Sequence, residues 1–379
     1  MTLPVRRCVP IGPCDDCTLL HGVIAVNGRF LGLHVTGIER YGREVLRLLE
    51  PTEVRVVGPP ARAAGSAGYL WEQGVLPRLL KPGEILWSPT NSGPLTVRNH
   101  VLTLHDAAVF DHPEWFSRKV RYTYANLVAR VAKRALEVTT DSEFAKERLV
   151  DRVGLDPARI TVAPGGVSLL RSSERGQPNS SPAVPRGRSD PDATPLPAGI
   201  EEPYVLTVST IEPRKNLERL LSAWRVVSKQ HRGLKLAVVG ATSNLFSHVS
   251  LERTPDSVVM LGYVSDHDLQ ALYSRSELFV YPSLYEGFGL PPLEAMAVGT
   301  PVVASDIPAL RETLAGAARL VDPNDPSCIA NEISAVLDDP SLRNALVDAG
   351  TERASKYTWQ RTTDALMAVF RRVQMEVAS

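Results

Sequence analysis

Residues 278–303 constrain the fold more than any other part of this chain. The apolar run 278–281 is typical of a buried strand. Pro291 suits the first turn of a following helix, where an amide hydrogen would have no partner, and Gly299 suits the end of that helix. A second apolar run follows at 302–304. This order predicts a parallel βαβ unit, and sheets built from such units bind ligands at the carboxyl ends of their strands.

The loop inside this unit offers backbone amides at the positive end of the predicted helix, where an anion is favoured. Glu286 stands in the loop and Glu294 in the first turn of the helix. Such a loop can hold a molecule that is anionic in one part and rich in hydroxyls in another, as a sugar nucleotide is. The alternative is that Glu294 only complements the helix dipole and that Glu286 is solvated. The loop residues expected to bind the ligand are Gly287, Phe288, Gly289 and Leu290.

A second strand-to-helix connection, within 204–224, carries two cations at the start of its helix. Pro213 suits the first turn, but Arg214 and Lys215 face the positive end of the helix dipole, which costs about 0.3–1 kcal/mol each. A bound diphosphate would reverse the sign of the local field, because Arg can grip two oxygens and Lys supplies a point charge. The alternative is that both are tolerated surface residues. Gly240 ends the next predicted strand, close to the expected nucleotide.

The N-terminal half carries further candidate groups near strand ends. His105 ends a buried run at 101–105. It is either a satisfied core group or one that serves a substrate hydroxyl as a hydrogen-bond donor or in proton transfer. Asp106 either orients His105 or contacts the acceptor. Gly37, between the first strand and the first helix, either belongs to a turn or lets an acceptor or phosphate approach the backbone.

Several of these segments resemble one enzyme family. Residues 278–303 resemble the nucleotide-sugar signature of family 4 of the retaining glycosyltransferases, the GT-B group. Residues 27–49, 70–73 and 86–89 resemble mannosyltransferase-like members of that family. The resemblance implies an α/β fold of two Rossmann-like doubly wound domains that face a central cleft.

The same resemblance implies a reaction and a role for each candidate. The reaction would be transfer of a hexose, with retention, from a nucleoside diphosphate sugar to a hydroxyl of a glycan or lipid-linked acceptor. Mannose and GDP-mannose are favoured. Arg214 and Lys215 would contact the diphosphate, and His105 would face the donor sugar. Glu286 would hold hydroxyls of that sugar, and Glu294 the ribose diol.

The pattern along the chain predicts two domains. Strand and helix patterns alternate through residues 1–170 and again through 203–357, which is typical of doubly wound parallel sheets. Between them, residues 171–202 are dense in Pro, Ser, Gly and charge and lack aromatic residues, so we expect a disordered linker. The GT-B resemblance implies that the last helix, 358–379, packs back on the N-terminal domain.

Composition excludes some classes of function. The formal net charge is zero, so no overall field points to nucleic acid. No apolar run reaches the roughly 18 residues that a membrane span needs, and the N-terminus lacks the apolar core of a signal peptide. Four cysteines in 379 residues do not make a disulfide scaffold. We therefore expect a cytoplasmic protein.

No metal or other cofactor is expected. Near the N-terminus there are four possible zinc ligands, Cys8, Cys14, Cys17 and His21. Zinc is one interpretation, and free thiols on a loose extension are the preferred one. Asp266 and Asp268 have the spacing of an Asp-x-Asp metal motif, but Ser265 and Asp268 are better explained as a capping box at a helix start.

Basic residues recur at helical spacing with apolar ones through residues 115–138. A solvated helix face is one interpretation. The other is a basic amphipathic surface in contact with anionic lipid at the inner face of the membrane.

Two other classes of function remain open from the residues. A non-catalytic protein that binds nucleotide sugars or glycans is disfavoured, because it would be free to lose the set Arg214, Lys215, Glu286 and Glu294. A sugar-nucleotide epimerase would explain the grip on a diphosphate but not the basic segment.

Overall fold

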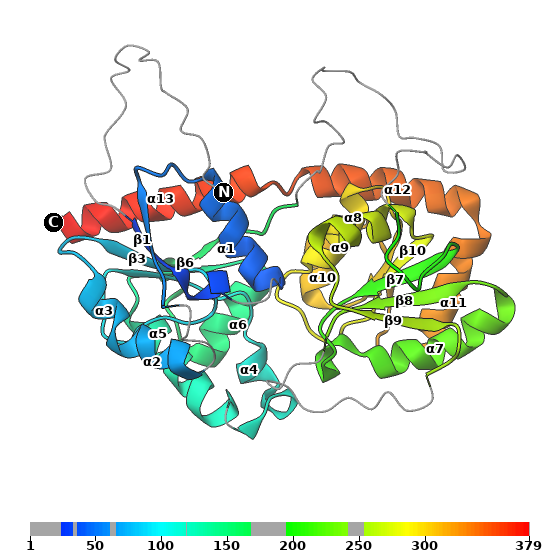
Figure 1. Ribbon diagram of the computed structural model, residues 1–379, viewed down its shortest axis with the longest axis horizontal. Helices are drawn as coiled ribbons and strands as arrows, with labels where there is room; N and C mark the ends of the chain where they lie inside the picture. Colours follow the sequence, from blue (N-terminus) through cyan, green and yellow to red (C-terminus); the bar gives the residue numbers. More distant parts are fainter. Residues whose placement is uncertain are drawn as a thin grey trace, which may run out of the picture.

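The structure is a computed structural model that describes residues 24–32, 36–60, 66–118, 120–167, 195–241 and 254–378. Within these residues the strands form two six-stranded sheets, and every neighbouring pair is parallel. Figure 1 shows the sheets in two lobes that lie side by side. The α/β expectation is therefore confirmed. Outside the described residues lie 171–194 of the expected linker and the four possible zinc ligands Cys8, Cys14, Cys17 and His21.

The N-terminal lobe holds the sheet β2-β1-β3-β4-β5-β6. Its strands are β1 (Ile24–Asn27), β2 (Val54–Val57), β3 (Ile85–Ser88), β4 (His100–Thr103), β5 (Glu137–Thr140) and β6 (Ile160–Val162). Its helices are α1 (Gly37–Leu48), α2 (Ser66–Gly74), α3 (Leu76–Leu79), α4 (Ala108–Asp111), α5 (Ala125–Arg134) and α6 (Glu143–Val153). β1, β3, β4 and β5 are buried along their whole length, as expected for a parallel sheet with both faces covered.

The C-terminal lobe holds the sheet β12-β11-β10-β7-β8-β9. Its strands are β7 (Tyr204–Val208), β8 (Lys235–Val239), β9 (Val258–Gly262), β10 (Leu278–Tyr281), β11 (Val302–Ser305) and β12 (Arg319–Val321). Its helices are α7 (Leu217–Gln230), α8 (Asp266–Arg275), α9 (Leu290–Ala297), α10 (Pro308–Leu314), α11 (Pro326–Asp338) and α12 (Pro340–Ser355). The strand order reverses between β7 and β10, and ligands bind at such a point in open α/β sheets.

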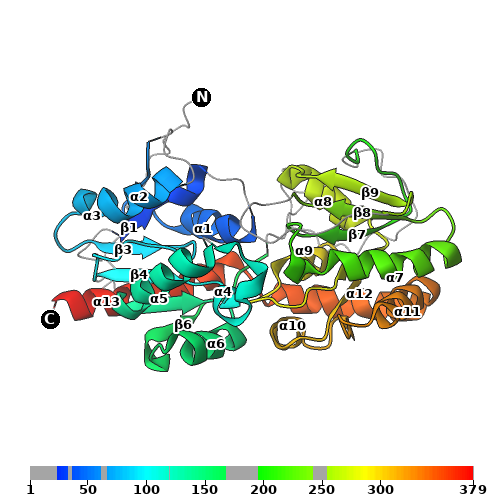
Figure 2. The same cartoon turned by 90° about the horizontal axis from the view of Figure 1, so that it is seen from below.

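The last helix, α13 (Trp359–Ala378), belongs to the N-terminal lobe by packing. Leu366, Val369 and Phe370 are fully buried in one hydrophobic cluster with residues of β1 and β3. The start of α13 packs directly against the backbone at Gly166. A side chain at Gly166 would stand 2.2 Å from the backbone nitrogen of Trp359. Figures 1 and 2 show α12 along the C-terminal lobe and α13 along the N-terminal one.

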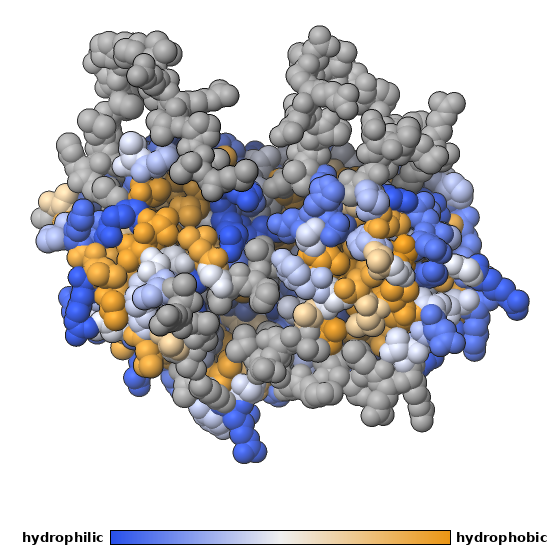
Figure 3. Space-filling model, in the orientation of Figure 1, coloured by the Kyte–Doolittle hydropathy of each residue, from blue (hydrophilic) through white to orange (hydrophobic). Residues whose placement is uncertain are grey.

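Polar groups make several of the contacts between the two lobes, beside ring contacts such as that of Tyr285 with Phe144. The carboxylate of Glu312, in α10, accepts hydrogen bonds from the backbone amides of Glu143 and Phe144 at 2.8 and 3.0 Å, at the positive end of α6. The Ser142 hydroxyl donates to the carbonyl oxygen of Gly287 at 2.5 Å. On the face shown in Figure 3, hydrophobic residues gather over each lobe, and hydrophilic residues lie between the two areas.

The basic segment 115–138 is not one continuous helix. A 3₁₀ turn, Pro113–Trp115, precedes a π-helical turn, Val120–Tyr124, which leads into α5. After α5 the helix ends at Ala135, whose ψ is 145°, and the chain enters the buried strand β5. Among the described residues, no helix has both the length and the apolar character of a membrane span.

Replacing Phe370 with alanine tests the docking of α13. Phe370 is fully buried and its ring lies edge-on to Trp87, with 5.8 Å between the ring centroids. We expect Phe370→Ala to lower the free energy of unfolding by about 3–5 kcal/mol in urea denaturation followed by circular dichroism. Met375→Ala, at a side chain that is 69% exposed, is the control and should change it by less than about 0.5 kcal/mol. Equal stability of the two variants would contradict the docking.

Candidate active site

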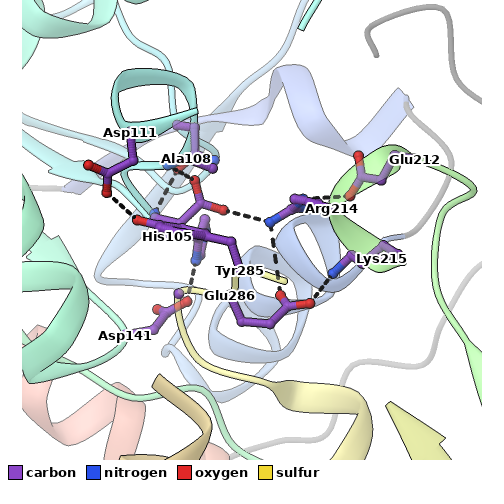
Figure 4. Close-up of polar contacts among 12 residues, drawn as sticks. His105, Ala108, Asp111, Asp141, Glu212, Arg214, Lys215, Tyr285 and Glu286 are labelled. Carbon is purple, nitrogen blue, oxygen red and sulfur yellow. Dashed lines mark hydrogen bonds and ion pairs between the residues drawn. The ribbon is translucent and has the colours of Figure 1, made fainter. Parts of the chain in front are cut away.

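Charged side chains that follow β4, β7 and β10 converge between the two lobes (Figure 4). Parallel strands place their carboxyl ends at one edge of each sheet. β4 leads into His105 and Asp106, and β10 leads into the loop that carries Glu286. The structure therefore brings together groups that are far apart in sequence.

Glu286 is held by the two cations that follow β7. Its Oε1 accepts a hydrogen bond from Lys215 Nζ at 2.5 Å, and its Oε2 lies 3.9 Å from Arg214 Nη1. The side chain is 6% exposed, so it is not the solvated residue of the alternative interpretation. Burial alone would raise the pKa of Glu286, but Lys215 and Arg214 outweigh it and lower that pKa. Glu286 is therefore an ionised carboxylate. Lys215 Nζ also donates to the Tyr281 hydroxyl at 3.0 Å.

Arg214 bridges the lobes. Its Nε donates to Glu212 at 2.6 Å within the C-terminal lobe, and its Nη1 donates to Asp106 at 3.2 Å in the N-terminal lobe. Burial disfavours the charged guanidinium, but Glu212, Asp106 and Glu286 outweigh burial and raise the pKa of Arg214. The residue is a permanent cation with carboxylates on three sides. One oxygen of the buried Glu212, Oε2, has no hydrogen-bond partner in the described structure.

The backbone before α7 differs from the expectation. Pro213 begins a separate 3₁₀ turn, Pro213–Lys215, and α7 begins only at Leu217. Asn216 separates them with a φ of 61°, a left-handed conformation that Asn tolerates better than most residues. Its side-chain amide donates to the carbonyl oxygens of Pro282 and Pro323 at 2.9 and 2.7 Å. These bonds fix the turn that presents Arg214 and Lys215.

Both ring nitrogens of His105 are occupied. Nδ1 lies 2.7 Å from Asp141 Oδ2, and Nε2 lies 2.8 Å from the carbonyl oxygen of Pro89. A carbonyl can only accept, so Nε2 carries a hydrogen. Burial alone would lower the pKa of His105, but Asp141 and Pro89 outweigh it and raise that pKa. The neighbouring Asp106 accepts from the backbone amide of Ala108 at 3.0 Å as well as from Arg214.

Glu294 has two partners, one from each lobe. Arg40, on α1, donates to its Oε1 at 2.8 Å, and the Tyr273 hydroxyl donates to its Oε2 at 3.1 Å. Burial raises the pKa of Glu294 in spite of Arg40. Arg40 also pairs with Asp266. Glu294 therefore does more than complement the dipole of α9.

The glycines of the loop before α9 are required by close packing. A side chain at Gly287 would stand 2.0 Å from the carbonyl oxygen of His105, across the lobe boundary. Gly289 caps α9 with a φ of 103°, which disfavours any side chain. Phe288 is buried and meets the Tyr357 ring edge-on, with 5.4 Å between the ring centroids, and Leu290 is the first residue of α9.

Two other candidate glycines have different surroundings. A side chain at Gly240 would stand 1.7 Å from the carbonyl oxygen of Ser209, which follows β7, so Gly240 lies beside the connection that carries Arg214. A side chain at Gly37, the first residue of α1, would meet nothing within 4 Å.

The sequence interpretation missed three residues of this region. Asp141 follows β5, so the strand-end rule that selected His105 could have found it. Tyr281 ends the strand β10, and Arg40 lies on a helix face with no motif of its own.

Within the described residues, no cluster of His, Cys, Asp and Glu has an arrangement that could hold a metal ion. Ser265 caps α8 by accepting from the amide of Asp268 at 3.1 Å.

Comparison with known proteins gives the family. Residues 194–353 match the family model of the glycosyl transferases group 1, and residues 86–171 match that of glycosyltransferase family 4. The chain is 30% identical over 306 residues to O-antigen chain mannosyltransferase B of Escherichia coli, across 76% of each protein. It is 32% identical over 233 residues to O-antigen chain mannosyltransferase RfbU of Salmonella typhimurium, across 60% of this chain and 58% of that protein.

The fold is shared with solved structures. Sucrose-phosphate synthase from Thermosynechococcus elongatus superposes with a TM-score of 0.67 at 20% identity, over 95% of this chain and all of that one. The GT-B expectation is confirmed, and family membership supports sugar transfer rather than epimerisation or binding alone. The chain thus belongs to the family 4, group 1 glycosyltransferases and is a retaining enzyme that uses a nucleotide-sugar donor.

Proposed function

We propose that this enzyme transfers mannose from GDP-mannose to a hydroxyl of a glycan or lipid-linked acceptor. The names of two relatives support mannose as the sugar, since both are O-antigen chain mannosyltransferases. The observation that carries the proposed site is the network in which Asp106, Arg214, Lys215 and Glu286 meet across the lobe boundary.

The diphosphate of the donor binds Arg214 and Lys215 in this proposal. The two side chains follow β7, beside the point where strand order reverses. The backbone amides at the start of α9, in Phe288, Gly289 and Leu290, add donors at a positive helix end. Together these groups stabilise the negative charge that develops on the leaving diphosphate. Because these cations compensate the negative charge, no metal ion is required.

The two carboxylates bind the neutral parts of the donor. Glu286 is ionised and accepts hydrogen bonds from hydroxyls of the donor sugar, at a position where Lys215 can contact the adjoining phosphate. Glu294 accepts from the ribose diol. Its present partner Arg40 comes from the opposite lobe, so the nucleotide binds where the two lobes already touch.

Proton transfer in this proposal relies on the donor itself. As the bond from the sugar to the diphosphate breaks, the acceptor oxygen bonds to the anomeric carbon on the same face, and a phosphate oxygen takes the hydroxyl proton. His105, with both ring nitrogens occupied, acts by charge and by holding the strand end rather than as a base. Asp106 contacts the acceptor next to Arg214, and Gly37 lets the phosphate or acceptor approach the start of α1.

The proposed location is the cytoplasm, at the inner face of the membrane. Arg121, Arg130 and Lys133 are exposed on the segment that ends in α5. These cations would be attracted to anionic lipid, where a lipid-linked acceptor resides.

A donor panel tests the identity of the substrate. We expect GDP-mannose to raise the melting temperature of the protein more than UDP-glucose does, because binding to the native state alone stabilises it. The measurement is differential scanning fluorimetry in buffer with EDTA, followed by analysis of mannose transfer to bacterial lipid extract. A larger shift with UDP-glucose and no mannosylated product would refute the donor assignment. Loss of transfer in EDTA would refute the metal-free mechanism.

Removing the charge of Lys215 tests the diphosphate site. Lys215→Met keeps the length of the side chain but removes the charge-assisted contact to the phosphate. We expect GDP to bind at least about tenfold more weakly in calorimetry. Lys229→Met, at an exposed residue of the following helix α7, is the matched control and should bind GDP as the wild type does. Unchanged GDP affinity in a folded Lys215→Met protein would remove Lys215 from the site.

The protonation of His105 gives a separate prediction. Because its pKa is raised above the ordinary value of about 6.5, the imidazolium should persist above that pH, with both nitrogens protonated in ¹⁵N NMR spectra. The stability that it contributes is fully present below about pH 6.5 and is lost as the pH rises through the folded-state pKa. Asp141→Asn should lower that pKa. A His105 that is neutral at pH 6.5 in the wild type would contradict this account.

A further inference from the structure

A hollow of about 640 Å³ lies on the N-terminal lobe, at the edge of the sheet opposite the candidate active site. Arg98, Leu136 and Arg159 line it, and they lie just before β4, β5 and β6. Because these strands are parallel, their amino ends share that edge. The last turn of α5 and one face of α13 complete the lining.

Positively charged side chains outnumber negatively charged ones in the lining of this hollow. Its five cations are Arg98, Lys133, Arg134, Arg159 and Arg372. The two carboxylates are Glu137 and Glu376, which leaves an excess of three positive charges. By contrast, the whole chain has a net charge of zero, so this excess is a local feature.

Three of the cations have no protein partner. Arg98, Lys133 and Arg134 are exposed, and their side chains form no hydrogen bond or ion pair with any residue that the structure describes. The dipole of α5 accounts for Lys133 and Arg134, which lie in its last turn. It does not account for Arg98, which comes from the connection before β4. Like charges gathered around a concave surface repel each other and raise the local concentration of anions.

Two of the guanidinium groups are held in place. Arg159 Nε donates to the carbonyl oxygen of Leu136 at 3.1 Å. Arg372, on α13, donates to the Thr161 hydroxyl at 2.9 Å and to Glu137. These bonds order the two side chains before a ligand arrives. A guanidinium held in this way presents a planar fork of donors, which matches the oxygens of a phosphate group.

We propose that this hollow is a second anion site, which binds a phosphate group on a soluble molecule or on a lipid headgroup. Arg159 and Arg372 orient the phosphate, and Arg98, Lys133 and Arg134 supply charge from its rim. The site does not depend on which sugar nucleotide the active site uses, because it lies at the other edge of the sheet.

A charge-reversal pair tests the site without touching its ordered arginines. Arg98→Glu/Arg134→Glu reverses two unpaired cations of the hollow and leaves Lys133, which also belongs to the proposed lipid-facing surface, unchanged. Lys229→Glu/Arg232→Glu makes the same change of charge at two exposed cations of the other lobe and serves as the control. The probes are inorganic pyrophosphate, titrated by calorimetry, and phosphatidylcholine vesicles with or without phosphatidylglycerol, followed by flotation. Both variants keep Arg214 and Lys215, so pyrophosphate bound at the donor site is common to both and cancels in the comparison.

We expect the hollow variant to bind at least one probe about tenfold more weakly than the wild type and the control. Weaker binding of pyrophosphate alone assigns the site to a soluble phosphate compound. Weaker binding of the phosphatidylglycerol vesicles alone assigns it to a lipid headgroup. If the wild type and both variants bind each probe equally, or if the wild type binds neither, the proposal is overturned. Should the double variant fail to fold, the single Arg134→Glu variant makes the same comparison against Lys229→Glu.

Discussion

The attraction between Arg214 and the carboxylates around it organises the region between the lobes. Arg214 pairs with Glu212 in its own lobe and with Asp106 in the other, and Glu286 lies close by. Removing such charges from water is costly unless they are mutually compensated. The two cations after β7 and the acids around them therefore stabilise one another. In the proposed function, the donor diphosphate meets cations that these acids already hold in place.

Several other contacts between the lobes are polar as well. Arg40 meets Glu294, Ser142 meets Gly287, and Glu312 accepts from the first amides of α6. Polar contacts can exchange partners with water or a ligand at a smaller net cost than apolar packing can. The close fit at Gly287 sets the limit of approach, since a methyl group there would collide with the strand end at His105.

The sequence predicted the parts of the fold and site that follow local rules. Apolar runs predicted β7 and β10. Strand ends selected His105, Arg214 and Glu286 as candidates, and the family resemblance implied that they share one cleft. The pairing of Arg40 with Glu294 could not be predicted, because it depends on how the two lobes pack. The prediction that α7 begins at Pro213 was wrong, because a left-handed Asn216 separates the Pro213 turn from the helix. The basic segment was read as one helix because its apolar spacing continues into the buried strand β5.

The return of the chain to its first lobe has a consequence for how the protein is made. The cluster that contains Ile24, Val26 and Trp87 is completed by Leu366, Val369 and Phe370, which follow the whole C-terminal lobe in the sequence. Domains commonly fold in order of synthesis, but this lobe leaves the ribosome with part of its apolar interior uncovered. The second lobe has its sheet complete by Val321, before α13 exists. Packing of the first lobe therefore waits until α13 has been translated, and a chain that stops before α13 leaves these apolar side chains uncovered.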